Sequence, residues 1–271
     1  MTPRTAVVTV TRGRDEHLAR QRRGLTGCLP GEHVVVGMGE EPRIGDGPPA
    51  TVVRVPVGDG GLPLAEARNA GAATAIDGGA ELLVFLDVDC IPEPVLLDRY
   101  AAASARVDGP ALLCGPVHYL PPPPPGGYPD TGLARLAGPH PARPAPPDGE
   151  LWPETRWELF WSLSFAVTVP TWRTLGGFCT GYAGYGGEDT DLAQVAASHG
   201  AGLYWVGGAV AHHQHHPPSV ADPARLGEIV RNANLFHRRW GWWPMGGWLD
   251  ELAAQDKVAF DRGRATLEVL T

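Results

Sequence analysis

Hydrophobic runs long enough to cross a membrane are absent from this sequence of 271 residues. No apolar stretch approaches the roughly 18–20 residues that a bilayer span needs, and one of the longest, residues 82–86, has the length of a strand. The apolar stretch near the N-terminus is interrupted by Arg12 and Arg14 too early for a secretory signal. We therefore expect a cytoplasmic protein with no membrane span.

Closely spaced cysteines and an excess of positive charge are also missing. No C-x-x-C pair occurs, so the spacing predicts neither a zinc knuckle nor a disulfide framework. The net charge is -8, so the chain gains no long-range attraction to nucleic acid or anionic lipid. We expect no nucleic-acid partner.

Glycine and proline, by contrast, are abundant and clustered. The chain contains 36 Gly and 28 Pro, and the run at residues 121–125 cannot be a helix or an inner strand. Residues 118–150 are predicted to form a long surface loop or lid rather than a linker between domains. With 43% hydrophobic residues the chain can bury a sizeable core, and we predict a single domain over residues 1–271.

Short apolar segments rich in β-branched residues alternate with helical segments in the first half of the chain. Strands are predicted at residues 5–10, 33–36, 51–57, 81–86, 165–169 and 203–206. Helices are predicted after Asp15 and at residues 64–76, 94–105 and 188–199. Nearly continuous apolar strands are covered on both faces, so the pattern indicates an α/β fold with a Rossmann-like, mostly parallel sheet and flanking helices. Ligands of such sheets bind outside the carboxyl ends of the strands.

Two aspartates follow the predicted strand at residues 81–86, in the sequence FLDVDCIP (residues 85–92). Asp87 and Asp89 share one face of an extended chain because they are two residues apart. Two hard oxygen ligands at such a point suit Mg²⁺ or Mn²⁺ carrying a diphosphate. The alternative is an Asp-rich turn with a capping role.

A dense run of histidines, AHHQHHPP, occupies residues 211–218. Neutral imidazole is a good ligand for borderline cations such as Mn²⁺ and Zn²⁺. His213 and His216 are three residues apart, so a single turn can bring both to one ion. The alternative is a solvated loop that binds nickel adventitiously.

Carboxylates also follow two glycines in YGGEDTDL (residues 185–192). Glu188 and Asp189 open a predicted helix, where the helix dipole favours negative charge and capping explains part of the pattern. The functional hypothesis is a general base presented on a tight glycine turn, within hydrogen-bond reach of an attacking hydroxyl.

Basic side chains follow the first predicted strand. The guanidinium groups of Arg12 and Arg14 could hold a phosphate or a nucleobase, although a plain surface role explains them equally well. Arg68 and Asn69, inside the Ala-rich helix, are open to the same two interpretations.

In this order along the chain, these motifs resemble those of inverting GT-A-fold glycosyltransferases. The chain is similar to the large family 2 enzymes and, in its second half, to the β-1,4-galactosyltransferase family. The matching motifs are RGRDEHL (residues 12–18), EARNAG (66–71), FLDVDCIP (85–92), GGFCTGYAGYGGEDTDL (176–192) and HHQHHP (212–217). The Pro-rich residues 118–150 lie outside the resemblance.

The resemblance implies a nucleotide-sugar-binding half, residues 1–117, and an acceptor and catalytic half, residues 151–271. It implies that Asp89 and His216 ligate Mn²⁺ or Mg²⁺. His213 would join them at a position that animal galactosyltransferases fill with methionine. The implied reaction moves a hexose, galactose or a related sugar, from a UDP-sugar to the hydroxyl of a carbohydrate or small-molecule acceptor, with inversion.

The resemblance also assigns individual roles. Asp189 would deprotonate the acceptor hydroxyl, and Glu188 would bind the acceptor or the donor sugar. Asp87 would lie near the ribose or the ion, and Tyr185 stands where the galactosyltransferases use a tryptophan beside both sugars. The remaining donor-binding positions would be Arg12, Arg14, Arg68 and Asn69.

Two other functions fit the same residues. A nucleotidyltransferase shares the parallel sheet and the carboxylate–metal site, but usually has a glycine-rich basic loop after the first strand, where this chain reads TVTRGRDEH (residues 9–17). A non-catalytic carbohydrate-binding protein would use the C-terminal tryptophans as a sugar platform. Core packing of a C-terminal helix pair is the alternative explanation for those tryptophans.

Overall fold

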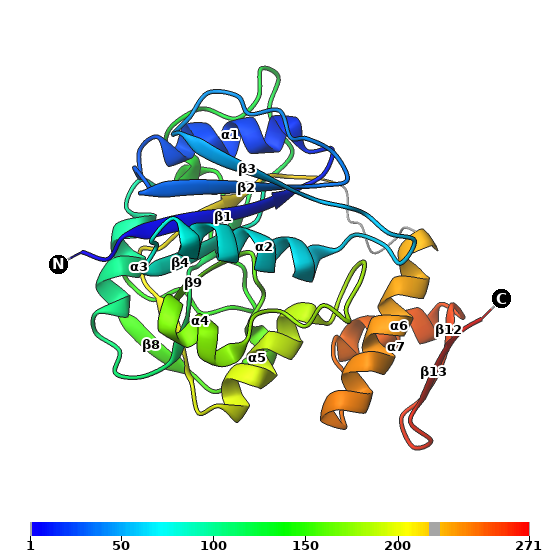
Figure 1. Cartoon of the computed structure of the whole chain (residues 1–271). Coiled ribbons are helices and arrows are strands. Elements are labelled where there is room, and N and C mark those ends of the chain that lie inside the picture. Colours follow the sequence, from blue (N-terminus) through cyan, green and yellow to red (C-terminus); the bar gives the residue numbers. More distant parts are fainter. Residues whose placement is uncertain (1, 217–222, 271) are drawn as a thin grey trace.

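The computed structural model describes residues 2–216 and 223–270. Within them, eight strands form one sheet in the order β3-β2-β1-β4-β9-β6-β10-β8 (Figure 1). Strands β8 and β9 run against their neighbours, and the other strands are parallel to one another. The strands are β1 (Thr5–Thr11), β2 (Glu32–Met38), β3 (Ala50–Val55), β4 (Leu82–Leu86), β6 (Ala111–Cys114), β8 (Leu151–Glu154), β9 (Ser164–Thr168) and β10 (Gly202–Val206).

The sheet is buried on both faces at its centre. Every residue of β1 and β4 is buried, as the continuous apolar runs predicted. Helices α2 (Leu64–Asp77), α4 (Val169–Leu175) and α5 (Glu188–Ser198) pack against one face. Helices α1 (Asp15–Leu25) and α3 (Leu96–Ser104) pack against the other (Figure 1). The predicted α/β fold class, with a mostly parallel sheet and flanking helices, is confirmed.

The Ala-rich helix α2 lies very close to the sheet. A Cβ atom at Gly71 would lie 2.5 Å from the side chain of Val8, so only glycine permits this approach. The close contact fixes α2 along β1 and sets the position of Arg68, one turn earlier on the same helix.

A second sheet of three short strands lies beyond the end of β4. It contains β5 (Cys90–Pro92), β11 (Ala211–His213) and β7 (Val117–Tyr119), in the order β5-β11-β7. In this sheet β11 is antiparallel to β5 and parallel to β7, with His213 opposite both Cys90 and Tyr119. Through the pairing of β5 with β11, the segment that follows Asp87 and Asp89 lies next to the histidine run.

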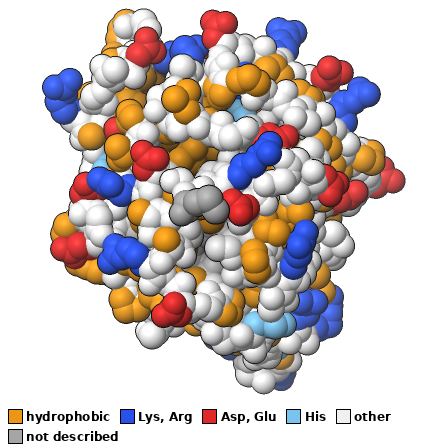
Figure 2. Space-filling view, turned by 60° about the vertical axis from the view of Figure 1, so that its left-hand side comes forward, with side chains coloured by type: hydrophobic (Ala, Val, Ile, Leu, Met, Phe, Trp, Pro, Cys, Tyr) orange, Lys and Arg blue, Asp and Glu red, His pale blue; other side chains and the backbone are white. Residues whose placement is uncertain are grey.

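Residues 118–150 are irregular apart from the end of β7 and a short 3₁₀ helix, Leu133–Arg135. A second 3₁₀ helix, Trp157–Leu159, precedes β9. The loop is attached to the small sheet, because Leu120, Tyr128 and Leu133 share a buried apolar cluster with Ile91. On the face shown in Figure 2, acidic and basic side chains are interspersed rather than gathered into a patch of one sign.

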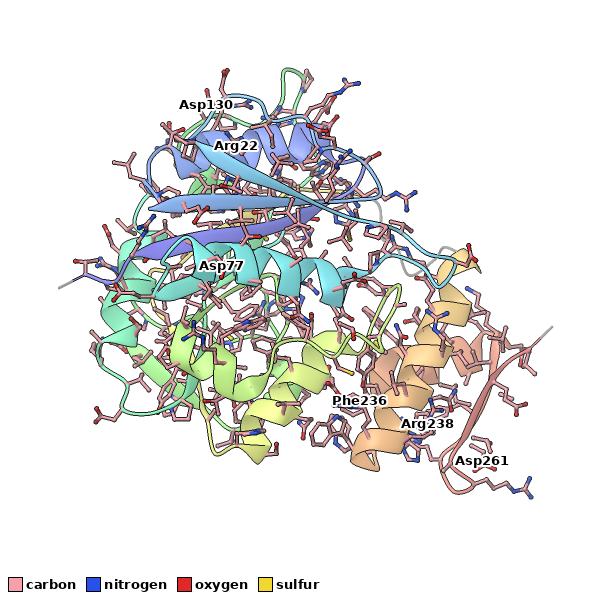
Figure 3. All side chains as sticks on the ribbon, viewed as in Figure 1. Arg22, Asp77, Asp130, Phe236, Arg238 and Asp261 are labelled. Carbon is pink, nitrogen blue, oxygen red and sulfur yellow. The ribbon has the colours of Figure 1, made fainter. Side chains whose placement is uncertain are left out.

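The C-terminal segment builds a small core of its own beside the main sheet (Figure 1). It contains α6 (Pro223–Trp240), α7 (Gly246–Ala254) and a hairpin of β12 (Val258–Asp261) and β13 (Thr266–Val269). Trp243 is buried in this core and stacks on His237, as core packing of a helix pair predicts. Phe236 and Arg238, labelled on α6 in Figure 3, mark the helix that joins this unit to the main sheet. Among the helices of the described residues, none combines the length and apolarity that a bilayer crossing requires.

Candidate functional site

One aspartate and two histidines converge where β4 ends. In Asp89, one carboxylate oxygen lies 3.5 Å from Nε2 of His213 and the other lies 3.2 Å from Nε2 of His216. One ligand atom from each residue lies within 4.8 Å of the other two. The pairing of β11 with β5 causes this, because it places His213 opposite Cys90, the residue after Asp89. Pro217 and Pro218, at the end of the predicted histidine motif, lie outside the described residues.

The protonation states of Asp89 and His213 suit a cation. Burial acts to raise the pKa of Asp89, but a hydrogen bond from His216 and the nearby His213 outweigh burial, so the pKa is lowered. Burial lowers the pKa of His213, which keeps its imidazole neutral at neutral pH. An ionised carboxylate with neutral imidazoles is the form in which these groups bind metals. The residues therefore fit a divalent ion, although their role as ligands stays a prediction.

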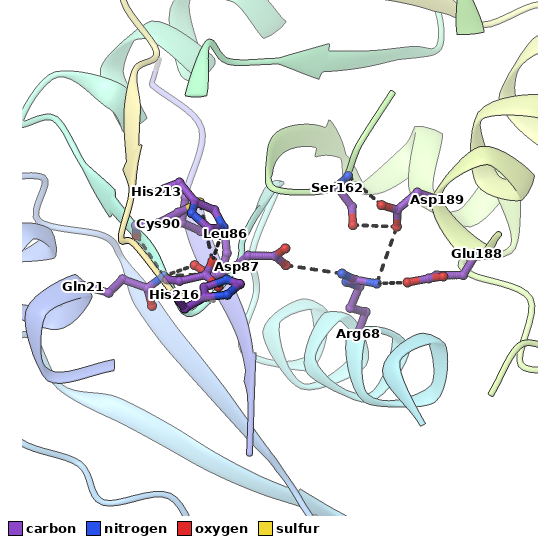
Figure 4. A network of polar contacts seen from close by, with 11 residues as sticks. Gln21, Arg68, Leu86, Asp87, Cys90, Ser162, Glu188, Asp189, His213 and His216 are labelled. Atoms are coloured by element: carbon purple, nitrogen blue, oxygen red, sulfur yellow. Dashed lines mark hydrogen bonds and ion pairs between the residues drawn. The ribbon is translucent and has the colours of Figure 1, made fainter. Parts of the chain in front are cut away.

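A second cluster is organised by the buried guanidinium of Arg68 (Figure 4). Nη2 donates to Asp87 at 3.3 Å, and Nη1 donates to Glu188 at 3.2 Å. Nη1 also lies 3.6 Å from Asp189. Arg68 thus connects the turn after β4 to the first turn of α5, which are about a hundred residues apart in sequence.

Asp189 is oriented by Ser162. The backbone N–H of Ser162 donates to one carboxylate oxygen at 3.0 Å and its hydroxyl donates to the other at 2.7 Å. Gly187, with φ of 91°, forms the turn that starts α5 and presents Asp189 beside β9. The side chain of Asp189 is 27% exposed, so it is positioned and still reachable by a substrate.

Burial raises two pKa values in this cluster, where three carboxylates share the single Arg68 cation. Burial, then the neighbouring Asp189, raises the pKa of Glu188 to about 7 against the opposing charge of Arg68. Burial is also the main cause of the raised pKa of Asp87. Without added ligands, the cluster therefore tends to retain a proton near neutral pH.

The raised pKa of Glu188 predicts a pH-dependent stability. The stabilisation of the folded state that is linked to this raised pKa is complete below the ordinary glutamate pKa of about 4.5. It is lost as the pH rises through about 7, because the buried Glu188 anion is disfavoured. We expect Glu188→Gln to gain stability relative to the wild type between pH 5 and pH 8, by more than about 1 kcal/mol. Urea unfolding at both pH values, without metal, measures this. The control is Glu158→Gln, at an exposed glutamate. A wild type and a Glu188→Gln variant with identical pH profiles would contradict the assignment.

Tyr185 lies on the glycine turn before α5. Its ring stacks on Trp248 of α7 with centroids 5.8 Å apart, and the guanidinium of Arg225 lies over it at 5.0 Å. Its backbone N–H donates to Glu228 of α6 at 3.0 Å. The C-terminal helices therefore border the candidate site as well as packing together.

A cavity of about 670 Å³ opens beside His216. Its lining residues are Gly13, Arg14, Asp15, Glu16, His17, Glu40, Glu41, Arg43 and His216. The backbone N–H of Gly13 donates to Glu40, which ties the turn after β1 to the turn after β2. Arg14 lines the cavity, whereas Arg12 is exposed and is not among the lining residues described, and nucleotide binding by either arginine stays a prediction.

Asn69, predicted to bind the donor, makes a structural contact with the backbone of Phe178. Its amide oxygen accepts from the backbone N–H of Phe178 at 2.9 Å, and its amide nitrogen donates to the Phe178 carbonyl at 2.8 Å. Both polar ends of the side chain are therefore engaged in holding the segment that leads to the glycine turn.

Several residues that position the site carry no functional signal in the sequence. Gln21 of α1 donates to the carbonyls of Asp87 at 2.6 Å and Cys90 at 3.1 Å, and so holds the turn that carries Asp89. Ser162 is an ordinary serine 27 residues before its partner. Both act through long-range contacts that sequence spacing does not indicate.

Comparisons with known proteins match this chain to glycosyltransferases. Residues 151–217 match the family described as the N-terminal domain of galactosyltransferase. TarS from S. aureus, residues 1–349, has a TM-score of 0.54 and 13% identity, over 86% of this chain and 64% of that chain. GalNAc-T7, solved with UDP, GalNAc and Mn²⁺, has a TM-score of 0.51 and 14% identity, over 93% of this chain and 57% of that one. Among curated protein sequences, none matches this chain significantly.

These matches identify the architecture as the GT-A fold of glycosyltransferases. The chain spans less than two thirds of the length of either solved structure. The family match covers the segment that contains Glu188, Asp189, His213 and His216. Together the family match and the fold support sugar transfer as the class of reaction.

Proposed function

We propose that this chain is a divalent-metal-dependent, inverting glycosyltransferase that moves a hexose from a UDP-sugar to the hydroxyl of a carbohydrate acceptor. One observation carries the proposal. A carboxylate–imidazole cluster, Asp89 with His213 and His216, lies at the sheet edge that also carries Asp189, and Arg68 joins the two ends through Asp87. An arrangement of this kind can bind a diphosphate at one end and activate a hydroxyl at the other.

The residues that would hold the ion are Asp89, His213 and His216. A donor set of one carboxylate and two imidazoles suits Mn²⁺ better than Mg²⁺, which prefers oxygen ligands. When bound, the ion supplies positive charge that offsets the negative charge on the departing diphosphate.

The donor would occupy the cavity beside His216. Its volume of about 670 Å³ falls within the range of small-molecule sites. Arg14 and His17 face it and can bind phosphate or ribose oxygens, while Glu40 can accept hydrogen bonds from the N–H groups of a base. UDP is the expected nucleotide, by analogy with the galactosyltransferase family and with GalNAc-T7, whose structure contains UDP.

Asp189 would accept the proton of the acceptor hydroxyl as its oxygen attacks the anomeric carbon. Ser162 donates to both carboxylate oxygens, which fixes their orientation. Attack from the face opposite the diphosphate is a single displacement, so the configuration inverts. Glu188, held by Arg68, and Tyr185, at the turn before α5, would contact the sugars.

Thermal-shift measurements with nucleoside diphosphates, each with and without Mn²⁺, test the donor site. We expect UDP to raise the melting temperature by several degrees only when Mn²⁺ is present, because a ligand at about 100 times its Kd stabilises the protein by about 2.7 kcal/mol. ADP, GDP and CDP are the comparison ligands, and Mn²⁺ alone is the blank. No metal-dependent shift with any nucleotide would contradict the proposal, and pyrophosphate release from a nucleoside triphosphate would favour a nucleotidyltransferase.

A further inference from the structure

A row of partly exposed rings starts at the candidate metal site and leads along the Pro-rich loop. Tyr119 stacks on His213 with centroids 4.6 Å apart, and His140 lies 5.3 Å from Tyr119. Trp161 follows, 5.3 Å from His140. Tyr119 is 40% exposed, and His140 and Trp161 are partly exposed. The rings are therefore available to a ligand along the length of the row.

The far end of the row reaches the proposed base. Trp161 is followed directly by Ser162, whose N–H and hydroxyl both donate to Asp189. The near end is His213, beside Asp89. A ligand lying along the row would therefore pass between the diphosphate end and the base end of the proposed reaction centre, where the acceptor must lie.

Arg143 lies beneath the row and, within the part of the chain that the structure describes, is buried without any hydrogen-bond partner for its guanidinium group. Arg143 is 6% exposed, and its three side-chain nitrogens have no hydrogen-bond partner among the described residues. Its guanidinium lies over the rings of Trp161 at 5.0 Å and Trp205 at 4.7 Å. Burial lowers its pKa, and contact with ring faces offsets only part of the cost of burying a cation.

This arrangement holds Trp161 in place at a cost in stability. Trp205 belongs to β10 and is fully buried, so Arg143 links the Trp161 ring to the rigid main sheet. The guanidinium covers one face of Trp161, which leaves the rest of the indole to a ligand. A buried cation without a hydrogen-bond partner does not favour folding, so its position calls for another explanation, and support of the Trp161 ring is one.

We propose that Tyr119, His140 and Trp161 form a platform for the pyranose rings of a glycan acceptor, and that Arg143 is the positioning residue that holds it. Rigid aromatic faces with polar rims suit a pyranose, which presents apolar C–H faces and hydroxyls at its edge. The platform rests on the proposed function, because it supplies the acceptor to Asp189. It uses the loop at residues 118–150, outside the motifs that resemble known glycosyltransferases.

Saturation-transfer NMR tests the platform with defined probes. Methyl β-glycosides of glucose, galactose and N-acetylglucosamine are each added to the full chain with UDP and Mn²⁺. We expect saturation of the axial C–H protons of at least one glycoside, with affinity about 2–10-fold lower in Trp161→Ala. The control is Trp152→Ala, at a tryptophan that is 44% exposed on the edge strand β8. The UDP–Mn²⁺ thermal shift must persist in both variants.

The same measurements separate the two proposals. If the wild type shows the UDP–Mn²⁺ shift but no glycoside is saturated, or if Trp161→Ala binds glycosides as well as Trp152→Ala, the platform is overturned and the proposed function stands. If UDP and Mn²⁺ give no shift, the proposed function itself fails.

Replacing Arg143 with methionine tests its positioning role. The variant removes an unpaired buried charge, so we expect an equal or higher melting temperature together with weaker glycoside saturation. UDP–Mn²⁺ binding should remain. Undiminished glycoside saturation in Arg143→Met would overturn the role of Arg143.

Discussion

Replacing Asp189 with asparagine is expected to lower sugar transfer by about 10²–10⁴-fold, the usual contribution of a general base. The amide cannot accept the proton of the acceptor hydroxyl, yet it keeps the size of the carboxylate and can still accept from Ser162. UDP and Mn²⁺ should bind almost unchanged, because the donor cavity lies beside His216 at the other end of the Arg68 network. The measurements are initial transfer rates and a UDP–Mn²⁺ titration on the same preparation.

The matched control for this variant is Asp98→Asn. Asp98 is exposed and lies in the first turn of α3, as Asp189 lies in the first turn of α5. Its replacement should leave transfer unchanged, which separates proton transfer from a general effect of removing a helix-terminal charge. Near wild-type turnover in Asp189→Asn would remove Asp189 from the role of base. Loss of UDP binding along with turnover would instead indicate a structural role.

The main sheet can be predicted from sequence because its central strands are short, uniformly apolar runs. Strands β1, β2 and β4 fall where residues 5–10, 33–36 and 81–86 predict them. The reversed direction of β9 leaves no such mark, because Ser164–Thr168 is almost as completely buried as β4, the strand against which it runs antiparallel. Its direction depends on the course of the chain that precedes it, which propensity does not encode.

The small sheet that assembles the metal triad is the clearest gap in the sequence prediction. Strands β5, β7 and β11 have three residues each, too few for a periodic pattern. The resemblance to glycosyltransferases nevertheless implied the convergence of Asp89 with His213 and His216, and the structure brings ligand atoms of the three within 4.8 Å of one another. The spacing of His213 and His216 predicts that a single turn can bring both to one ion. The pairing of β11 with β5, which ends at His213, is what brings them beside Asp89, and the spacing does not indicate it.

The supporting residues of the site could not be predicted, because their contacts are long-range. Asn69 was expected at the donor, but the backbone of Phe178 occupies both ends of its amide. Gln21 in α1 and Ser162, two residues before β9, are both buried, and neither is marked by any pattern in the sequence. Candidate catalytic and metal-binding residues can thus be recognised from their type and their order in the sequence. The residues that orient them can be recognised only from the three-dimensional structure.

Removing a proposed metal ligand is expected to have an effect as large as removing the proposed base, Asp189. Asp89→Asn, His213→Ala and His216→Ala should each weaken Mn²⁺ binding by more than about 100-fold, because even changes to residues behind metal ligands cost about 10–100-fold. Transfer should fall in parallel, and the UDP thermal shift should lose its dependence on Mn²⁺. Titration of Mn²⁺ followed by its electron paramagnetic resonance signal measures the affinity directly, without reference to activity.

The histidine run provides its own control for that experiment. His215 is exposed and lies between His213 and His216 in sequence, and only its backbone N–H makes a described hydrogen bond, to Tyr128. His215→Ala removes an imidazole from the same run without touching the three converging side chains, so Mn²⁺ affinity and transfer should stay at the wild-type level. If all four histidine and aspartate variants bind Mn²⁺ equally well, the ion does not use this cluster. If His215→Ala loses as much Mn²⁺ affinity as His216→Ala, several histidines of the run bind the metal together. The triad of Asp89, His213 and His216 is then the wrong ligand set.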